Sequence, residues 1–512
     1  MWIILYIKVL LTFLNNTLMK KLFTLLTIIF FTTTIQAQWT QLGTDFYGRT
    51  DFDHNGHSLD FSADGKTIAI SAPEYDFGRK GYVHVYEWNG SSWVQKGNDI
   101  IGGSVDEYFG VRLALSNDGN TFVVGAPEND NAGTNAGTVR VYEWDGNAWV
   151  QKGGDIDGEA PVDWFGVSVS MNASGNIIAA GAYFNDGADT NAGHVRVFEW
   201  NGSSWIQKGV DIDGLSHSDR FAIVSLNAVG DIVAIGSQYN DGAGADAGHV
   251  RIFAWNGAAW VQKGSTISGS LPGSYAGSPS LNAVGDIVAI GGLDPARGAN
   301  TGSVRVFEWD GSDWKQKGAD IDDEAVGDGG GHARIDGSGN RIVVGAEANS
   351  DGGADAGHVR VFDWDGGSWV QLGTDIDGIA YDELGMFVAI SDDGATIATG
   401  NPFNDAGGII RGLVRVYRYT SPVGIVESSF NEHFTAYPNP TTGNFAFDLG
   451  HNYETANIKI MDVTGREVLS KSYNTVNQLN ITLNEPKGIY FYVLELNDEK
   501  NTIYKGMVSV LK

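Results

Sequence analysis

The sequence predicts an all-β protein, a seven-bladed β-propeller followed by a small C-terminal β-sandwich. A Trp-x-Gln-x-Gly motif recurs seven times at intervals of 54 to 56 residues, as expected of a repeat architecture. No segment between the motifs has a convincing helical period, and apolar residues alternate with small or polar ones. Glycine supplies 70 of 512 residues, about twice its usual share of ~7%, as many tight turns require. The motif begins at Trp39, Trp93, Trp149, Trp205, Trp260, Trp314 and Trp369.

The composition excludes several classes of protein. The chain has 62 Asp and Glu against 33 Lys and Arg, a net charge of −29, which argues against a nucleic-acid partner because phosphate binding needs a basic surface. The absence of Cys excludes disulfides, thiolate metal sites and cysteine nucleophiles. Hydrophobic residues make up 42% of the chain and no Gly-X-Y period occurs, so collagen and general disorder are both excluded.

Residues 1–37 are predicted to precede the folded protein. Residues 1–18 read as an upstream extension, and residues 19–37 as a signal peptide with two lysines, the apolar run Leu22–Phe31 and a cleavage site before Gln38. A membrane anchor built from both apolar stretches is the alternative, but the lysines interrupt the run and neither half reaches ~18 apolar residues. We therefore expect a mature protein outside the cytoplasm with no transmembrane helix.

Each repeat contains four strand signals, seen most clearly in the third. Trp149–Ile156, Phe165–Met171, Ile177–Ala182 and His194–Trp200 are bounded by Gly, Asn and Asp. An Asn-Gly step then leads into the next Trp, and such steps favour hairpins because they adopt the positive φ that the turn needs. Four antiparallel strands, repeated seven times, are typical of propeller blades.

The two ends of the repeat array are complementary. Trp39–Phe46 reads as a strand with no blade before it, whereas the last group of strands ends at Leu413–Tyr419 with no Trp-x-Gln strand after it. The first strand is therefore predicted to complete the last blade and close the ring, so that residues 38–420 form the propeller. An open β-solenoid is the alternative, and it would not need a missing strand at one end matched by an extra strand at the other.

One position of the third strand carries arginine in most repeats. Alternation along the strand places Arg140 on the same face as Tyr142 and, across the hairpin, Trp149. Recurrence in equivalent blades favours a structural role, in which each Arg stacks on an aromatic ring or pairs with Asp between blades. A ring of anion-binding sites is the alternative. The residues are Arg140, Arg196, Arg251, Arg305, Arg360 and Arg415, with His84 in the first repeat.

Short motifs within the repeats resemble a known family. Phe109-Gly110 with Gly125-Ala126-Pro127, and Phe165-Gly166 with Gly181-Ala182, resemble the Phe-Gly/Gly-Ala-Pro (FG-GAP) propeller repeat of integrin α-chains and bacterial surface proteins. The resemblance covers residues 39–419 and implies a propeller. Repeats of that family often carry an Asp-x-Asp-x-Asp-Gly loop for Ca²⁺. The corresponding turns here are shorter and poorer in carboxylates, so this type of calcium site is not expected at them.

Other loops offer a set of candidate Ca²⁺ ligands. They combine Asn, Asp and Gly, and Ca²⁺ takes 6–8 oxygen ligands, several of which such a loop can supply. The alternative is that these residues only form turns with positive φ. Asp-x-Asp pairs such as Asp155 and Asp157 also recur, and repetition favours a structural or solubility role for them over metal binding. The candidate ligands are Asp186, Asp189, Asp241, Asp246, Asp351 and Asp355.

No catalytic residue stands out. His194, His249 and His358 occupy equivalent positions in different blades, so they are expected to lie too far apart to form one cluster of metal ligands. Motifs of serine hydrolases, zinc proteases and P-loop enzymes are absent. No pair of carboxylates suited to glycoside hydrolysis is distinguishable from the repeat background. The sequence therefore predicts no catalytic site and no cofactor other than Ca²⁺.

The C-terminal residues 435–512 differ from the repeats and follow a predicted linker, 421–434. Their motifs resemble the type A sorting domain of the type IX secretion system of Bacteroidetes. The resemblance implies a small β-sandwich that the outer-membrane export machinery reads and usually removes. A generic β-sandwich appendage is the alternative. The matching positions include Tyr437, Pro438, Asn439, Pro440, Gly443, Asp462, Gly465, Gly488, Tyr490 and Lys505.

These features together predict a monomeric, secreted or cell-surface binding module that is not an enzyme. Loops that depart from the repeat are expected to mark its binding face, namely Tyr47–His57, Leu271–Gly277, Leu293–Ala299 and Asp323–His332. An extracellular polysaccharide hydrolase or lyase, with acidic or His residues at the propeller centre, is the first alternative, and a purely structural adhesin is the second. The aromatic residues expected to contact a glycan or protein ligand are Tyr47, Tyr108, Trp164 and Tyr275.

Overall fold

The computed structural model describes residues 38–73, 78, 80–420, 436–462, 466–496 and 503–511. The chain divides into two compact units, residues 1–423 and 424–512. The predicted signal peptide, the predicted linker and Gly465 lie outside the described residues. In the described part of the chain, no helix is long and apolar enough to cross a membrane.

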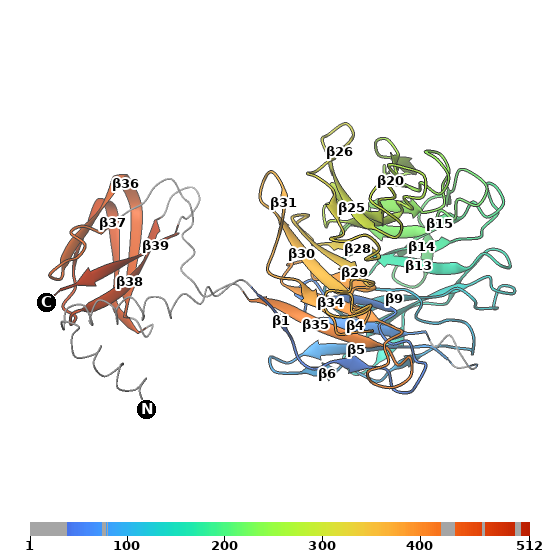
Figure 1. Ribbon diagram of the computed structural model, residues 1–512, viewed down its shortest axis with the longest axis horizontal. Coiled ribbons are helices and arrows are strands. Elements are labelled where there is room, and N and C mark those ends of the chain that lie inside the picture. The colour runs from blue at the N-terminus through green and yellow to red at the C-terminus, as the bar shows by residue number, and fades with distance from the viewer. Residues whose placement is uncertain are drawn as a thin grey trace, which may run out of the picture. The chain divides into compact units, whose positions relative to one another are not determined.

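The first unit consists of seven small antiparallel sheets, each of five strands in the same order (Figure 1). In six of the sheets the first four strands in chain order lie side by side, and a fifth, very short strand pairs with the third. In the seventh sheet, the first two strands of the chain take the fourth and fifth places. Each Trp-x-Gln strand is the fourth strand of the preceding blade. In blade 3, Trp205 lies opposite Trp200 with their ring centroids 5.4 Å apart, which confirms the predicted hairpin. This third blade consists of β13 (Phe165–Met171), β14 (Ile177–Ala182), β15 (His194–Trp200), β16 (Trp205–Gln207) and β17 (Ile212–Asp213).

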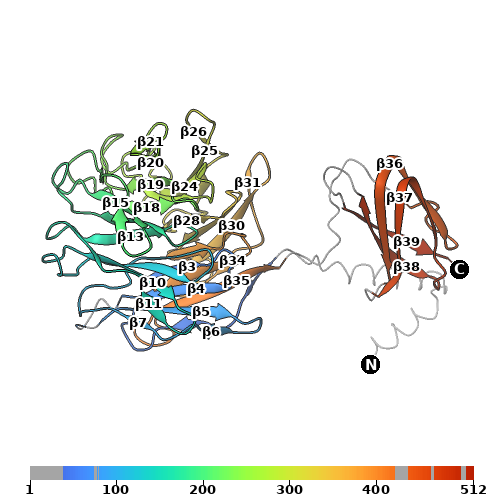
Figure 2. The same ribbon diagram turned by 180° about the vertical axis from the view of Figure 1, so that it is seen from behind.

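The other blades repeat this order, as the view from behind also shows (Figure 2). Blade 1 consists of β3 (Ser58–Phe61), β4 (Thr67–Ala72), β5 (Tyr82–Trp88), β6 (Trp93–Gln95) and β7 (Ile100–Ile101). Blade 2 consists of β8 (Leu113–Leu115), β9 (Thr121–Ala126), β10 (Thr138–Trp144), β11 (Trp149–Gln151) and β12 (Ile156–Asp157). Blade 4 consists of β18 (Ile223–Leu226), β19 (Ile232–Ser237), β20 (His249–Trp255), β21 (Trp260–Gln262) and β22 (Ile267–Ser268).

Blades 5 to 7 follow the same plan. Blade 5 consists of β23 (Ser278–Leu281), β24 (Ile287–Leu293), β25 (Gly302–Trp309), β26 (Trp314–Gln316) and β27 (Ile321–Asp322). Blade 6 consists of β28 (Gly330–Ile335), β29 (Arg341–Ala346), β30 (His358–Trp364), β31 (Trp369–Gln371) and β32 (Ile376–Asp377). Blade 7 consists of β33 (Phe387–Ile390), β34 (Thr396–Asn401), β35 (Leu413–Thr420), β1 (Gln38–Gln41) and β2 (Phe46–Tyr47).

Blade 7 joins the two ends of the array, as predicted. Strand β1 pairs antiparallel with β35, so that Trp39 lies opposite Tyr419, and β2 adds the pair Phe46 and Val414. The first strand therefore completes the last blade and removes both open edges of the ring. This closure excludes an open solenoid.

The recurring Trp ties each blade to the next. The Trp205 indole Nε1 donates to the Lys152 carbonyl of the preceding blade at 2.7 Å, and Trp39 donates to Leu372 at 3.1 Å, which completes the circle. Nearer the axis, the blades approach so closely that a Cβ atom at Gly181 would collide with the carbonyl oxygen of Ala222. Only Gly fits where two backbones meet in this way, which explains the recurrence of Gly at this position.

A ring of backbone hydrogen bonds links the seven turns that follow the innermost strands. Each turn donates one amide to the carbonyl of the next turn, at 2.9 to 3.2 Å. We call this feature the turn ring. Its seven bonds run from Ala63 to Asn117, Asn117 to Ala173, Ala173 to Ala228, Ala228 to Ala283, Ala283 to Gly337, Gly337 to Asp392 and Asp393 to Ala63.

The second unit is one antiparallel sheet with its own core. The strand order is β37-β36-β38-β39, and its buried cluster includes Phe447, Ile458 and Leu494. The long strands β36 and β37 shift register between Asp448 and Tyr453. The described residues thus form a single curled sheet rather than two stacked sheets. The strands are β36 (Asn444–Met461), β37 (Glu467–Thr482), β38 (Gly488–Leu496) and β39 (Ile503–Val510).

Candidate functional site

The innermost strands of the seven blades line a central cavity of about 440 Å³. Several serines of its wall hold adjacent blades together. Ser168 and Ser170 of blade 3 accept hydrogen bonds from the backbone amides of Val224 and Leu226 in blade 4, at 3.1 and 3.0 Å. These hydroxyls satisfy amides that would otherwise be unpaired where adjacent blades meet.

Asp60 replaces one of these serines. It occupies the blade 1 position equivalent to Ser170, and its Oδ2 accepts the Leu115 amide at 2.8 Å. Its Oδ1 accepts the Phe61 amide at 2.9 Å. Desolvation nevertheless raises the pKa of Asp60 to about 6, because the channel walls withhold water from the charged form. The cavity therefore contains a carboxyl group that titrates near neutral pH.

Two arginines reach the same cavity, Arg112 from blade 2 and Arg334 from blade 6. Each guanidinium donates to a backbone carbonyl of its own strand, at 2.8 and 2.9 Å. Within the described part of the chain, neither forms an ion pair with a carboxylate. Burial and the positive charge of Arg112 lower the pKa of Arg334, while the charge of Asp60 acts in the opposite direction.

Histidine and phenylalanine side chains complete this side of the cavity. His57 Nδ1 lies 3.3 Å from Arg112 Nη1, and the Phe387 ring lies 5.2 Å from the Arg112 guanidinium. Burial and the neighbouring Arg112 hold the pKa of His57 well below its usual range, so the imidazole is neutral. His332 Nε2 lies 3.3 Å from Glu347 Oε2. These residues break the seven-fold pattern of the wall.

A strained turn precedes the innermost strand of every blade. Its central residue is buried and is acidic in six of the seven blades, and the residues on both sides of it have positive φ. In blade 3, Val162 has φ 71° and Trp164 φ 57°, while Asp163 between them accepts a hydrogen bond from Asn185 at 3.0 Å. A non-glycine residue in this conformation costs about 1–2 kcal/mol. The central residues are Asp53, Glu107, Asp163, Asp219, Ser274, Asp328 and Asp382, each at most 5% exposed.

The residue after each central residue differs between blades although its backbone is the same, with φ between 46 and 72°. These seven residues lie directly before the innermost strands, at the end of the channel opposite the turn ring. We call this end the mouth. The mouth residues are His54, Tyr108, Trp164, Arg220, Tyr275, Gly329 and Glu383.

Across blades 3 to 5 the mouth carries a chain of ring contacts. Trp164 packs edge-on against Phe184 at 5.0 Å, and the Arg220 guanidinium lies 4.5 Å from the Tyr239 ring. Tyr239 packs edge-on against Tyr275 at 6.0 Å. We call these five residues the aromatic arc. Adjacent Tyr183 and Gln238 line the central cavity, so the arc borders its opening.

The four aromatic residues predicted for a binding face do not all come together. Tyr108, Trp164 and Tyr275 occupy equivalent mouth positions, and two of them belong to the aromatic arc. Tyr47 lies in β2 and is 38% exposed, and its hydroxyl donates to Asp45 at 3.1 Å. A role of these four residues in ligand binding stays a prediction.

The candidate Ca²⁺ ligands lie in surface loops. Asp186 accepts the Asn191 amide and Asp241 accepts the Asp246 amide, at 2.7 and 2.8 Å, which is the turn chemistry given above as the alternative. In the blade 6 loop that contains Asp351 and Asp355, the backbone amide of Asp351 donates to the Asn349 side chain at 3.0 Å. A Ca²⁺ site at these loops, to which Asp189, Asp246 and Asp355 would also contribute, stays a prediction.

The recurring arginines stack and pair as expected. The Arg196 guanidinium lies 4.1 Å from the centre of the Phe165 ring, and Arg251 lies 4.0 Å from that of Phe221. Arg140 instead pairs with the buried Glu107 at 3.0 Å. These contacts account for the recurrence of this arginine in six of the seven blades, and an anion-binding role of the arginines stays a prediction.

Blade 5 departs most from the repeat, and the departure leaves a second cavity of about 250 Å³. Ser270, Ser274 and Ser303 line it where other blades carry larger or charged side chains, and Arg305 and Leu293 complete its wall. Two of the divergent loops predicted from the sequence, Leu271–Gly277 and Leu293–Ala299, contribute to this cavity.

The sorting motif is well defined in the second unit. Tyr437 pairs through its backbone with Ala446, and Asn439 Oδ1 accepts the Ser509 amide at 2.9 Å. Asp462 pairs with Arg466 at 2.9 Å. The other described motif positions are Pro438, Pro440 and Gly443 before β36, Gly488 and Tyr490 in β38, and Lys505 in β39 opposite Val493.

Comparison with known proteins identifies this second unit. Residues 435–509 match the family described as "Secretion system C-terminal sorting domain". This match confirms the sorting domain of type IX secretion, and the protein is therefore exported to the outer surface or the exterior of the cell. A search of the curated proteins finds no match.

Two solved structures resemble the propeller at low similarity. One is described as a "putative 6-phosphogluconolactonase" from Bacteroides uniformis ATCC 8492, with 10% identity and a TM-score of 0.45, covering 63% of this chain and 86% of that one. The other has the same description and comes from Bacteroides fragilis NCTC 9343, with 12% identity, the same TM-score and coverage of 63% and 85%. Similarity of this extent says nothing about a shared substrate.

The sequence analysis missed the charged cavity. It did not single out Asp60, Arg112 and Arg334. Each is a single-residue difference between one repeat and the others. Aligning the seven innermost strands would have found them, since Ser, Ala or small apolar residues stand at most equivalent positions.

Proposed function

We propose that the propeller is a secreted, non-enzymatic binding module for an acidic glycan. Its acidic group binds Arg112 and Arg334 in the cavity, and its sugar rings rest on the aromatic arc. One observation carries the proposal: two guanidiniums line one cavity and, among the described residues, neither forms an ion pair with a carboxylate, in a chain of net charge −29.

Unpaired guanidiniums away from bulk water favour an anionic ligand. Removing a charge from water is costly unless an opposite charge or several hydrogen bonds compensate. The planar guanidinium forms paired hydrogen bonds with carboxylate and sulfate-like groups, which adds geometric selectivity. Desolvation in the cavity raises the pKa of Asp60, although the nearby charge of Arg334 lowers it.

The mouth supports recognition of an extended ligand. Its backbone is the same in seven blades, held by a buried central residue, while the displayed side chains differ. Variable residues on a rigid scaffold are typical of binding surfaces. Tyr and Trp provide large contact areas and lose little conformational entropy on binding.

We also propose that the blades are of the FG-GAP type. Phe109, Phe165 and Phe221 are fully buried, as the Phe of that motif would be. A Cβ atom at Gly125 would collide with the Gly166 carbonyl oxygen of the next blade. The two halves of the motif therefore meet across each blade interface, which is a physical reason for their recurrence together.

After export, we propose that the module acts in adhesion at the cell surface or as a released, monomeric binder. The sorting domain would be its contact with the export machinery, and the glycan would be contacted at the mouth and in the central cavity. A protein ligand at the mouth, or a purely structural role in adhesion, would instead leave acidic oligosaccharides unbound.

An enzyme is the second candidate, because Asp60 favours it. A carboxyl group with a pKa of about 6 beside arginines suits proton transfer at neutral pH. Such a site would cleave an acidic polysaccharide by hydrolysis or elimination at the propeller centre. The two candidates differ in one observable, the release of shorter chains.

Calorimetric titration of residues 38–512 with oligogalacturonate and with a neutral cello-oligosaccharide of equal length tests the proposal. We expect binding of the acidic ligand only, weakened by added salt because screening reduces charge attraction, and no change in ligand length on chromatography. Equal affinity for both ligands, or no binding to this or other acidic oligosaccharides, would overturn the proposal. Shortened acidic chains would establish the enzyme instead.

A further inference from the structure

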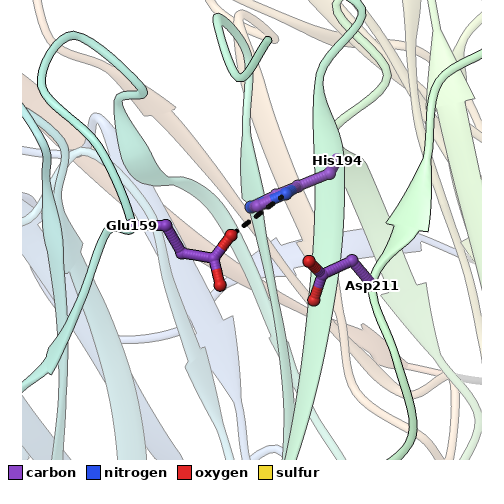
Figure 3. A group of neighbouring side chains, drawn as sticks. All are labelled: Glu159, His194 and Asp211. Atoms are coloured by element: carbon purple, nitrogen blue, oxygen red, sulfur yellow. Dashed lines mark ion pairs between the residues drawn. The ribbon is translucent and has the colours of Figure 1, made fainter. Parts of the chain in front are cut away.

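Three ionisable side chains converge at one edge of blade 3, outside the central cavity. Glu159, His194 and Asp211 each offer one ligand atom, and these atoms lie within 4.8 Å of one another (Figure 3). His194 Nδ1 lies 4.0 Å from Glu159 Oε2. Blade 6 repeats the group with Glu324, His358 and Asp375, and the same pair of atoms is again 4.0 Å apart.

The fold positions these residues from three separate segments. His194 begins β15, Glu159 belongs to the segment that enters blade 3 before β13, and Asp211 lies between β16 and β17. Pairing of β17 with β15 places Asp213 opposite His194 and so brings the Asp211 segment alongside. Gln207 of the Trp-x-Gln motif donates to Asp211 Oδ1 at 2.6 Å and orients the carboxylate.

The buried imidazoles provide an independent indication of a ligand. His358 is fully buried, and neither of its ring nitrogens has a hydrogen-bond partner. Its Nδ1 faces Glu324 Oε2. Burying a polar nitrogen without a partner costs free energy, and native structures rarely leave one unsatisfied. His194 is 1% exposed, and its Nδ1 likewise faces a carboxylate oxygen, Glu159 Oε2.

The neighbouring arginine does not contact the carboxylate oxygen that faces the imidazole. Arg196 Nη1 lies 3.7 Å from Glu159 Oε1, whereas Oε2 faces the imidazole, and blade 6 repeats this arrangement with Arg360. The arginine therefore contacts the outer oxygen of the carboxylate. In each of the two blades, one arginine accompanies two carboxylates, so the cluster keeps a net negative charge. A bound cation would compensate that charge.

The other blades form an internal comparison. Blade 4 has the equivalent His249, 2% exposed and with its Nε2 also unpartnered, but Leu215 and Thr266 replace the two carboxylates. In the four remaining blades neither the His nor the Glu is present. The residues at the Glu and His positions there are Arg49 and Tyr82, Gly103 and Thr138, Ser270 and Ser303, and Ile379 and Leu413.

We infer that blades 3 and 6 each bind one divalent transition-metal ion, with Zn²⁺ as the best match, through Glu, His and Asp. An imidazole with two carboxylates suits Zn²⁺ and similar first-row ions, whereas Ca²⁺ prefers an all-oxygen set of 6–8 ligands. Three protein ligands leave a fourth position for water. Each ion would join the segment entering the blade to its third strand and its outer hairpin.

Metal analysis of residues 38–512, without an affinity tag and after treatment with a chelator, tests this inference. We expect calorimetric titration with ZnCl₂ to give two ions per chain. Glu159→Gln should leave one ion, and Glu159→Gln with Glu324→Gln none. His249→Gln is the matched control, because it changes an equivalent buried histidine that has no carboxylates, and it should keep both ions.

Thermal unfolding provides a second readout and a check on folding. Zn²⁺ should raise the melting temperature of the wild-type chain, because a ligand that binds only the folded state stabilises it, and the double variant should lose this shift. The Glu159 side chain is 45% exposed, so its substitution leaves the core intact. Glu159→Asp, which keeps the charge but shortens the reach, should lose the same ion. Undiminished stoichiometry in the double variant, or no Zn²⁺ binding by the wild type, would overturn the inference.

Discussion

The two ends of the central channel are built by the same seven blades but differ in how strictly they repeat. At the turn ring, seven backbone hydrogen bonds of 2.9 to 3.2 Å join equivalent residues. At the mouth, seven residues share one left-handed backbone conformation but belong to six different residue types. The comparison separates the part of the repeat that closes the ring from the part that is available to bind.

The need to close the ring of blades explains this difference between the two ends of the channel. A ring of seven closes only if each interface contributes nearly the same rotation, so residues where blades touch cannot vary independently. Side chains at the mouth touch solvent or one another, and they can change without altering the ring. A non-repeated residue within the channel wall, such as Asp60, is therefore more informative about function than any repeated one.

The largest effect is expected where two blades touch. Gly181→Ala places a Cβ atom against the Ala222 carbonyl. Because backbone cannot move without displacing the next blade, we expect a loss of about 3 kcal/mol or more in the free energy of unfolding, at the upper end of overpacking effects. Chemical denaturation followed by Trp fluorescence would measure it.

The matched control is Gly202→Ala at a hairpin tip, where nothing lies within 4 Å of the added atom. Its φ of 99° makes alanine unfavourable there, at a cost of about 1 kcal/mol. Equal destabilisation by both substitutions would show that the close approach of the two blades at Gly181 costs no more than the positive φ at Gly202.

A substitution at Asp60 tests whether a residue that departs from the repeat pattern lowers the free energy of unfolding. Its pKa is about 6 in the folded chain and 3.8 as the ordinary value, so the folded state holds the proton more tightly. Its contribution to stability is fully present below pH 3.8 and is lost as the pH rises through 6. The loss is about 3 kcal/mol over the whole range, of which about 2 kcal/mol falls between pH 4 and 7. Asp60→Asn cannot titrate. The difference in unfolding free energy between wild type and this variant should therefore fall by that amount between pH 4 and 7.

The same measurement on Asp64→Asn is a control, since that exposed carboxylate has a lowered pKa through its bonds to Lys66 and Ser62. Its effect should have the opposite sign. A difference for Asp60→Asn that stays constant with pH would contradict the raised pKa in the channel.

The sequence predicted the features that recur from blade to blade and the domain at the C-terminus. Ring closure was predicted from an extra strand at one end of the array and a missing strand at the other. The pairing of Trp39 with Tyr419 confirms it. Stacking of Arg196 followed from repetition, because a residue found in most blades must serve the blade itself. The sorting domain followed from a motif that the family comparison confirms.

The candidate sites were less predictable for a physical reason. His194 was correctly placed far from its equivalents in other blades, but its neighbours Glu159 and Asp211 come from segments 35 residues before and 17 residues after it in the chain. Only the folded blade brings such segments together. Arg112 and Arg334 belong to different blades and meet across the axis, which no local pattern indicates.

The third expected effect concerns those two arginines. Arg112→Met or Arg334→Met should lower the affinity for an acidic oligosaccharide at least tenfold, because each removes a charged partner of the ligand. Each substitution should leave the unfolding free energy unchanged or raise it, because a buried charge with no ion pair is lost. Calorimetry on both variants measures the affinities.

Lys315→Met is the control for this experiment. Lys315 lies on β26 with its side chain 61% exposed, and it carries the same charge as the arginines. Its loss should change the affinity by less than about twofold, since exposed charges are screened. A similar decrease in all three variants would indicate general attraction of the ligand rather than binding in the channel.

The smallest expected effect lies at the mouth. Tyr275→Ala removes the last ring of the aromatic arc, which contacts Tyr239 at 6.0 Å. We expect a decrease of about 2- to 5-fold in affinity for a long acidic oligosaccharide, since most interface residues contribute less than about 1 kcal/mol. A short ligand confined to the channel should bind unchanged. Ile206→Ala, which removes an exposed side chain of the outer strand β16, should alter neither affinity. Equal losses from the two substitutions would contradict the distinction between the mouth and the repeated frame.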